Sequence, residues 1–407
     1  MITEAKQILT TFAAKIPPSI IGPERVRYIV EHSDNIQTEQ RQTLIQLVNN
    51  ILGIMIDRNA SDVEIGGNGT QNYIWFRIHG KKERVMDLPQ FSEDEASTLI
   101  VNLLTNNQKE YLLENRNLDF SYSFYFEKAQ NKVRFRADAY FDLDSVTMNM
   151  RAIQSRIRPI ESLDFHPNAI RTMSHNYIKF GLSLVTGITG SGKSTTLDAI
   201  IDFHNDQDPC HIVIIASPIE YVHKSRMSII KHREVGRDVT TFKDGVIQSL
   251  RQDPDIIVIG EMRDPATIMA ALEVTDTGHK VFSTLHTSSA VESIDRIIAE
   301  VNPREQERVR YRLADVLISV VSQKLVPSLD GKRVLAKEVL LVTSSVRAAI
   351  KNNNTSEIYL MINQGGPQGM VTMEQDLLRL YAEKKISKEN AIAYSNNKTR
   401  INQLIKG

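Results

Sequence analysis

Residues 187–194, Gly-Ile-Thr-Gly-Ser-Gly-Lys-Ser, have the types and spacing that proteins use to bind a chain of phosphate groups. Glycines let successive backbone N–H groups turn toward phosphate oxygens, and a helix that begins at the end of the loop adds its positive dipole. Lys193 would reach the β- and γ-phosphates of a nucleoside triphosphate, and Ser194 would supply one oxygen ligand to Mg²⁺. The predicted nucleotide-binding residues are Gly187, Thr189, Gly190, Ser191, Gly192, Lys193, Ser194 and Thr195.

The segments around this loop favour a phosphate-binding loop over a glycine-rich turn that matches by chance. Residues 182–186 are an apolar run of the length of a buried parallel strand. After the loop, apolar residues recur at 197, 200 and 201, with the spacing of one helix face. Strand, loop and helix together predict binding of a nucleoside triphosphate.

Three further groups follow predicted strands and could take part in the chemistry. Glu261 follows the apolar run 256–259 after Gly260, and we expect this run to lie beside the strand of the phosphate loop. The Glu261 carboxylate could orient or deprotonate water, or hold the metal through a water. His286 follows the run 280–285. A histidine at this position could contact the phosphates, although a structural role is more common. Glu220 follows the run 211–216.

The elements that would position these groups alternate between strand and helix from residue 160 onward. Such alternation predicts a doubly wound, mostly parallel sheet. Because the carboxyl ends of parallel strands meet at one edge of the sheet, the three groups should converge there. After residue 343 the pattern is helical to the end.

The first part of the chain has a different pattern. Residues 1–35 contain three prolines and predict a short helical tail followed by a loose connector, whereas residues 38–58 predict a helix with a wide apolar face. Between residues 60 and 155, short alternating segments and one helix over 92–106 predict an α+β domain with an antiparallel sheet. Its last strands carry Arg134, Arg136 and Arg151. Taken alone, these could be ordinary arginines on a face exposed to solvent.

Composition narrows the function and the location. Lysine plus arginine equals aspartate plus glutamate, 49 each, so the formal net charge is zero and there is no strong nucleic-acid signal. Cys210 is the only cysteine, which excludes an intramolecular disulfide and a multi-cysteine zinc site. No apolar run approaches the ~20 residues of a membrane-spanning helix, and the start does not resemble a signal peptide. We therefore expect a cytoplasmic protein that would reach a membrane only through a partner.

Four motifs in order give the chain a resemblance to a known family. A Walker A motif (187–195), an Asp box (216–223), a Walker B motif (253–264) and a His box (277–288) resemble those of the secretion ATPases, specifically the type IV pilus retraction ATPases, over about residues 58–395. The resemblance implies an α/β fold, in which a smaller PAS-like α+β domain precedes a RecA-like ATPase domain and C-terminal helices. It divides the chain into an N-terminal helical extension (1–57), the PAS-like domain (58–156), a linker (157–164), the ATPase domain (165–343) and a C-terminal helical region (344–407).

The resemblance also implies roles for particular residues and partners. Glu261 would be the catalytic glutamate, Glu220 the acid of the Asp box, and His279 and His286 the His-box pair. The three arginines would reach the nucleotide within or across a homohexameric ring. The ring would hydrolyse ATP with Mg²⁺, dock on an inner-membrane pilus platform protein and drive pilus retraction, the basis of twitching motility.

Two residues depart from the family pattern and keep other hypotheses open. Ala216 and Ser217 stand where the Asp box usually begins with Glu-Asp, which predicts a weaker metal site or slower turnover. The alternatives are a type IV secretion or conjugation ATPase, or a nucleotide-binding accessory subunit that scarcely hydrolyses ATP. DNA translocation is a weaker idea, and the zero net charge does not support it. The single cysteine argues against the pilus extension ATPases, which carry a four-cysteine zinc motif.

Overall fold

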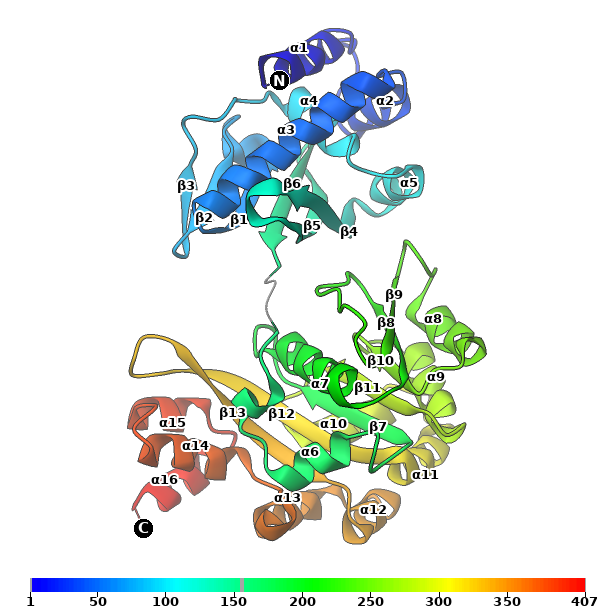
Figure 1. The fold of residues 1–407 in the computed structure, drawn as a ribbon, viewed down its shortest axis with the longest axis vertical. Helices are drawn as coiled ribbons and strands as arrows, with labels where there is room; N and C mark the ends of the chain where they lie inside the picture. Colours follow the sequence, from blue (N-terminus) through cyan, green and yellow to red (C-terminus); the bar gives the residue numbers. More distant parts are fainter. Residues whose placement is uncertain (1, 154–156, 407) are drawn as a thin grey trace. The chain divides into compact units, whose positions relative to one another are not determined.

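The computed structural model describes residues 2–153 and 157–406, which form two compact units, Met1–Ser155 and Arg156–Gly407 (Figure 1). The first unit is built on a six-stranded antiparallel sheet with the order β3-β2-β1-β6-β5-β4. Its strands are β1 (Ala60–Gly66), β2 (Trp75–Ile78), β3 (Lys81–Arg84), β4 (Asn117–Phe126), β5 (Asn131–Asp142) and β6 (Ser145–Ala152).

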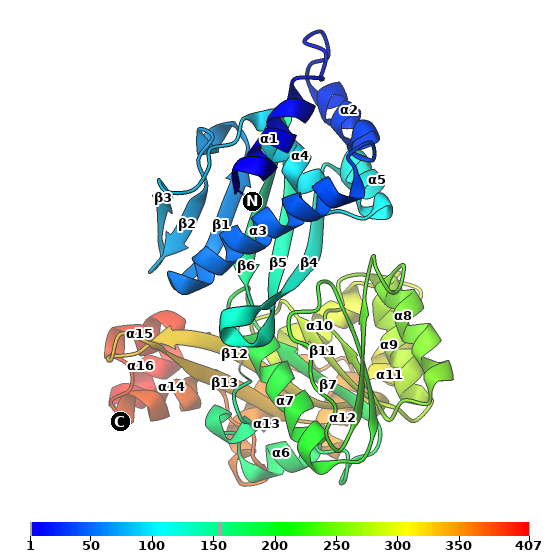
Figure 2. The ribbon, with the colours of Figure 1, turned by 45° about the horizontal axis from the view of Figure 1, so that its top comes forward.

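Alternation along these strands separates an apolar face from a polar face. On β5, Phe135 and Ala137 are buried, while Arg134 and Arg136 point to the other side, because neighbouring side chains in a strand face opposite ways. Helices pack on the apolar face, and α3 runs across it (Figure 2). The helices are α1 (Ile2–Ala13), α2 (Pro23–Ser33), α3 (Thr38–Asp57), α4 (Glu93–Val101) and α5 (Asn106–Asn115), with short 3₁₀ turns at Asn68–Thr70 and Glu127–Ala129.

The first 57 residues are more regular than the sequence predicts, and they share the core of this unit. The expected loose connector contains α2, because Pro23 is the first helical residue, where a missing N–H costs nothing. Arg25 of α2 pairs with Asp94 of α4 at 2.6 Å. The single helix expected over 92–106 is two helices, since Thr105 caps a new one with Gln108 in a capping box.

The second unit contains a seven-stranded sheet with the order β13-β12-β7-β11-β10-β8-β9. All neighbouring strands are parallel except β12 and β13. The strands are β7 (Gly181–Thr186), β8 (His211–Ala216), β9 (Ile229–Glu234), β10 (Ile256–Ile259), β11 (Lys280–Leu285), β12 (Leu317–Pro327) and β13 (Arg333–Leu341). The sequence pattern did not indicate β9 or β12, and β10 was expected beside β7, whereas β11 separates the two strands.

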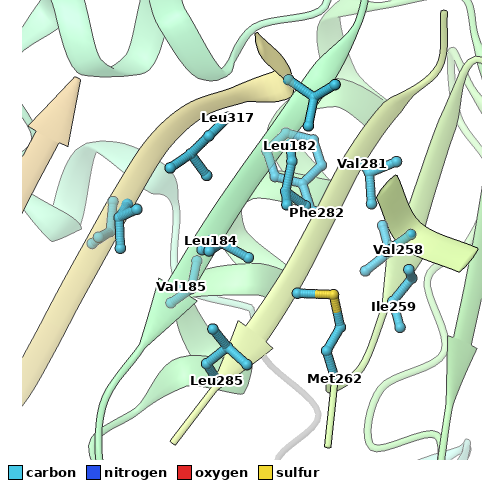
Figure 3. Close-up of a cluster of buried hydrophobic side chains, with 14 of the residues drawn as sticks. Leu182, Leu184, Val185, Val258, Ile259, Met262, Val281, Phe282, Leu285 and Leu317 are labelled. Atoms are coloured by element: carbon cyan, nitrogen blue, oxygen red, sulfur yellow. The ribbon is translucent and has the colours of Figure 1, made fainter. Parts of the chain in front are cut away.

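Helices cover both faces of this sheet. The connection from β7 through α7 to β8 crosses the sheet in one direction, and the connections from β9 through β10 and β11 to β12 cross it in the opposite direction. Because crossovers between parallel strands are right-handed, α7 lies on one face of the sheet and α8 to α11 lie on the other (Figures 1 and 2). Apolar side chains of the central strands, such as Leu182, Val281 and Ile259, are fully buried between them (Figure 3). The helices are α6 (Pro167–Met173), α7 (Lys193–Gln207), α8 (Phe242–Ser249), α9 (Pro265–Asp276), α10 (Ala290–Ala299) and α11 (Gln306–Val316), with 3₁₀ turns at Ile160–Leu163 and Leu250–Gln252.

The last helices close around the end of the β12–β13 hairpin. Glu374 is fully buried, and its Oε1 accepts hydrogen bonds from the backbone N–H groups of Asn396 at 2.9 Å and Asn397 at 2.8 Å. Lys324 of β12 donates to the carbonyl of Tyr394 at 2.7 Å and to Oδ1 of Asn396 at 2.6 Å. These helices are α12 (Ser344–Lys351), α13 (Ile358–Gln364), α14 (Met373–Ala382), α15 (Lys388–Tyr394) and α16 (Lys398–Lys406), with 3₁₀ turns at Thr355–Glu357 and Gly366–Gln368.

Lys280, at the start of β11, is a buried cation whose charge should make stability depend on pH. Its Nζ donates to the carbonyls of Ile178 at 2.9 Å and Thr172 at 3.3 Å, and burial lowers its pKa to about 7. Below that pH the lysine is protonated in both the folded and the unfolded state. Above it, the folded state loses the proton first, so this group makes the free energy of unfolding rise with pH up to the unfolded pKa.

We expect Lys280→Met to remove that rise. Between pH 7.5 and 9 the stability of the variant relative to the native protein should fall by about 1.4 kcal/mol per pH unit. Urea unfolding of both proteins across this range measures the difference. The same difference at every pH would contradict a proton-linked cost at Lys280.

Candidate nucleotide site

The phosphate loop joins the end of β7 to the start of α7. Gly187, Gly190 and Gly192 have φ angles of 149°, 80° and 89°, the left-handed region that favours glycine. Lys193 is the first residue of α7, and its Nζ donates back to the carbonyls of Gly187 at 2.7 Å and Ile188 at 3.2 Å. The ammonium group is therefore already held over the loop.

Two carboxylates lie near enough to this lysine to act on its charge. Burial lowers the pKa of Lys193, and the negative charges of Glu261 and Glu220 partly oppose that shift. Both acids come from residues that follow parallel strands, Glu261 after β10 and Glu220 after β8. The structure thus brings the predicted acids to the edge of the sheet that carries the phosphate loop.

Glu261 is held between two side chains. Its Oε1 lies 2.7 Å from Nε of Arg263, and its Oε2 lies 3.5 Å from Nε2 of His286. The carboxylate is mostly buried, with 17% of the side chain exposed, whereas Arg263 is 69% exposed. Glu261 therefore has a fixed direction at the sheet edge, and Arg263 stays within reach of a ligand.

His286 follows β11, the strand between β7 and β10. Burial lowers its pKa, and the charge of Lys193 lowers it further, while Glu261 acts in the opposite direction. The imidazole is therefore neutral at pH 7 and can exchange one hydrogen bond with Glu261 or with a phosphate.

Two other histidines, His223 and His232, hold the loop that carries Glu220. Nε2 of His223 lies 3.0 Å from Oδ1 of Asp198 on α7, and the backbone N–H of His223 donates to Nε2 of His232 at 3.0 Å. His223 is 4% exposed. The Asp box is thus attached to the helix that begins at Lys193, one turn beyond the phosphate loop.

The structure does not bring His279 to this site. His279 precedes β11, and its Nδ1 lies 3.0 Å from Oγ1 of Thr277 and 3.2 Å from the carbonyl of Val274. His286 follows the other end of the same six-residue strand, which spans about 20 Å. The two histidines of the His box therefore lie at opposite edges of the sheet, and within one subunit only His286 is placed to meet a nucleotide.

Arg134, Arg136 and Arg151 lie in the first unit, on the polar face of its sheet. Arg136 and Arg151 are direct cross-strand partners on β5 and β6. Each lies near a carboxylate, Arg136 with Asp119 at 3.4 Å and Arg151 with Asp62 at 2.7 Å, which offsets the repulsion between like charges. A role for these arginines at a nucleotide stays a prediction.

Two residues at the site, Arg263 and Gln323, were not predicted from the sequence. Arg263 was visible as a basic residue two positions after Glu261, but no spacing rule assigns it to the carboxylate. Gln323 was hidden because β12 was not identified; its Nε2 donates to the carbonyl of Ser191 in the phosphate loop at 2.8 Å.

The oxygen groups at the site suit Mg²⁺. Ser194 is exposed at the start of α7, so its hydroxyl is open to a ligand, and Glu261 offers a second oxygen donor. In the described parts of the chain, no group of three or more His, Cys, Asp or Glu residues could hold a metal by itself. This donor set fits an ion that is bound mainly through phosphates and water, as Mg²⁺ usually is.

The fold and this site define a P-loop ATPase: a phosphate loop on a largely parallel sheet, with a glutamate at the tip of a second strand. The type II/IV secretion system protein family model matches residues 37–402. The chain belongs to this family.

Relatives with more specific names cover most of the chain. A twitching motility protein of Neisseria gonorrhoeae is 37% identical over 77% of this chain and 82% of its own length. The type IV pilus retraction ATPase PilT of Pseudomonas aeruginosa is 36% identical over 84% of this chain and 96% of its own length.

Solved structures agree in fold. The pilus retraction motor PilT with bound ADP superimposes with a TM-score of 0.76 at 34% identity, covering 87% of this chain and 98% of that one. The ATPase DotB of Legionella pneumophila gives a TM-score of 0.72 at 26% identity, covering 96% of this chain and 98% of that one. As for membrane insertion, the described residues include no helix both long enough and apolar enough to cross a bilayer.

Proposed function

We propose that this ATPase is a hexameric motor that hydrolyses ATP with Mg²⁺ and drives the retraction of a type IV pilus. The observation that carries the proposal is the convergence of Lys193, Glu261, His286 and Glu220 at one edge of the sheet. The similarity to proteins named for pilus retraction and twitching motility favours a pilus motor over the ATPase of another secretion system. A homohexamer docked on an inner-membrane platform protein, and so peripheral to the membrane, comes from the resemblance alone.

Each site residue has a task in this mechanism. Lys193 would move from the loop carbonyls to the β- and γ-phosphates and offset their charge. Mg²⁺, held beside the Ser194 hydroxyl, would supply further charge neutralisation on the phosphates. Glu261 would orient the attacking water and accept its proton, while Arg263 and His286 keep its carboxylate in place.

The arginines of the first unit would complete the mechanism from outside the phosphate loop. A guanidinium group that meets the γ-phosphate stabilises the charge that develops during transfer. Exchange of Arg136 or Arg151 from its carboxylate partner to the nucleotide would then link turnover to movement of the first unit.

The test measures both the ring and the work it does. The purified native protein should assemble into hexamers with ATP and Mg²⁺, and turnover should rise with assembly. In a piliated host whose gene for this protein is deleted, pili should accumulate on the surface, and the native gene should restore retraction. Normal pilus retraction after the deletion would refute the pilus assignment, and secretion assays in that strain would then test the type IV secretion alternative.

Ala216 and Ser217 support a second candidate, an accessory subunit that binds ATP but scarcely hydrolyses it. Ala216 ends β8, and a Cβ added to Gly260, the residue before Glu261, would lie 3.0 Å from the Ala216 methyl. A methyl therefore packs where the family pattern has a carboxylate. Turnover that stays near zero at protein concentrations where rings form, with nucleotide binding intact, would favour this candidate.

A further inference from the structure

Gln323 lies directly under the phosphate loop. The ladder between β12 and β7 ends at the pair Ser322 and Thr186, so Gln323 is the first residue of β12 beyond the end of β7. It is 1% exposed, and its Nε2 donates to the carbonyl of Ser191, which is itself 2% exposed. Because a carbonyl can only accept, this contact fixes which end of the amide faces the loop.

Both ends of the loop press against the same residue. A Cβ added to Gly187 would lie 2.5 Å from the backbone oxygen of Gln323, and one added to Gly192 would lie 3.3 Å from its Nε2. The glycines at these two positions therefore let the loop settle on Gln323, besides allowing its positive φ angles.

The hydrogen bond also decides which way a peptide group of the loop points. In a planar trans peptide, the carbonyl of Ser191 and the N–H of Gly192 point in opposite directions. Since Gln323 holds that carbonyl below the loop, the N–H of Gly192 is directed to the upper side, where phosphate oxygens would bind. Ser191 lies between two glycines, so without this contact the peptide could turn over at little steric cost.

We propose that Gln323 is a positioning residue for nucleotide binding: it prevents the Ser191–Gly192 peptide from turning its carbonyl toward the phosphates. The inference rests on the proposed binding of ATP at this loop. Its Oε1 has no hydrogen-bond partner among the described residues, so the amide makes only the contact that the proposal needs.

The test replaces Gln323 with methionine, which has a similar length and shape but no donor. We expect the dissociation constant of a fluorescent ATP analogue and the KM for ATP to rise about tenfold, with kcat within about threefold. The thermal unfolding midpoint should change little, because the substitution also removes the unpartnered buried oxygen. A purely structural role would instead lower the midpoint and leave KM unchanged.

Ser319→Ala is the matched control on the same strand. The Ser319 hydroxyl donates to Oγ of Ser183 at 3.0 Å between β12 and β7, equally buried but away from the loop, and its loss should leave the affinity unchanged. Equal affinities for native and Gln323→Met proteins would overturn the proposal, as would equal losses in both variants. Failure of the native protein to bind the analogue would instead overturn the nucleotide site itself, and this inference with it.

Discussion

Glu261→Gln is expected to reduce steady-state ATP turnover about 100-fold or more, while the affinity for a fluorescent ATP analogue stays within about threefold of native. Glutamine keeps the size of the side chain and can still contact Arg263 and His286, but it cannot accept a proton from the attacking water. Binding depends mainly on the phosphate loop and Lys193, which this substitution leaves in place.

Glu273→Gln is the matched control, because Glu273 is an exposed glutamate on α9. It should turn over ATP at the native rate. If Glu261→Gln retained native turnover, Glu261 would not be the base, and Glu220 would become the next candidate. If the native protein bound ATP but failed to hydrolyse it even as a ring, the accessory-subunit hypothesis would replace the motor.

Lys193→Met should weaken binding of the ATP analogue about 100-fold and abolish measurable turnover. The half-buried ammonium group meets the most highly charged part of the nucleotide, and hydrogen bonds to charged groups contribute about 1.5–3 kcal/mol each. Methionine keeps most of the aliphatic length, so the fold of the loop should survive. Equilibrium titration of the analogue measures the change.

Lys243→Met removes a lysine from the exposed surface of α8 and serves as the control for loss of charge. Its affinity should equal that of the native protein. Equal affinities for the Lys193→Met and native proteins would mean that the nucleotide binds elsewhere on the chain.

The sequence was sufficient for the parts of the site that are local in the chain. The phosphate loop, its strand and its helix occupy one continuous segment, and Glu261 and His286 each follow an apolar strand, so backbone geometry alone brings them to one edge. Helix α2 was harder to predict, because Pro23 looks like a helix breaker until its place at the first helical position is known.

Strand β12 was not predicted from the sequence, and the reason is physical. Buried polar residues interrupt its apolar pattern, and two of them are satisfied by a partner far away in the chain: Ser322 by Thr186, and Ser319 by Ser183, both 136 positions apart. A pattern read along the sequence cannot show such pairing. Gln323 was missed with the strand that carries it.

The places of His279 and His286 depend on the strand between them rather than on their spacing in the motif. Seven positions separate His279 from His286, but an extended strand lies between them and carries the two to different edges of the sheet. The family motif gives the order of the residues, whereas the edge follows from the direction of the strand.

The buried hydrogen bonds of Glu374 and Lys324 bear on how the chain can be shortened. Cutting the chain before Tyr394 would leave the Glu374 carboxylate without its two backbone donors and Lys324 without its acceptors. Lys324 is the neighbour of Gln323, so the damage would begin one residue from the strand position that contacts the phosphate loop. Residues 394–397, although far from the nucleotide in sequence, are thus not dispensable, and a purification tag is better added beyond them than substituted for them.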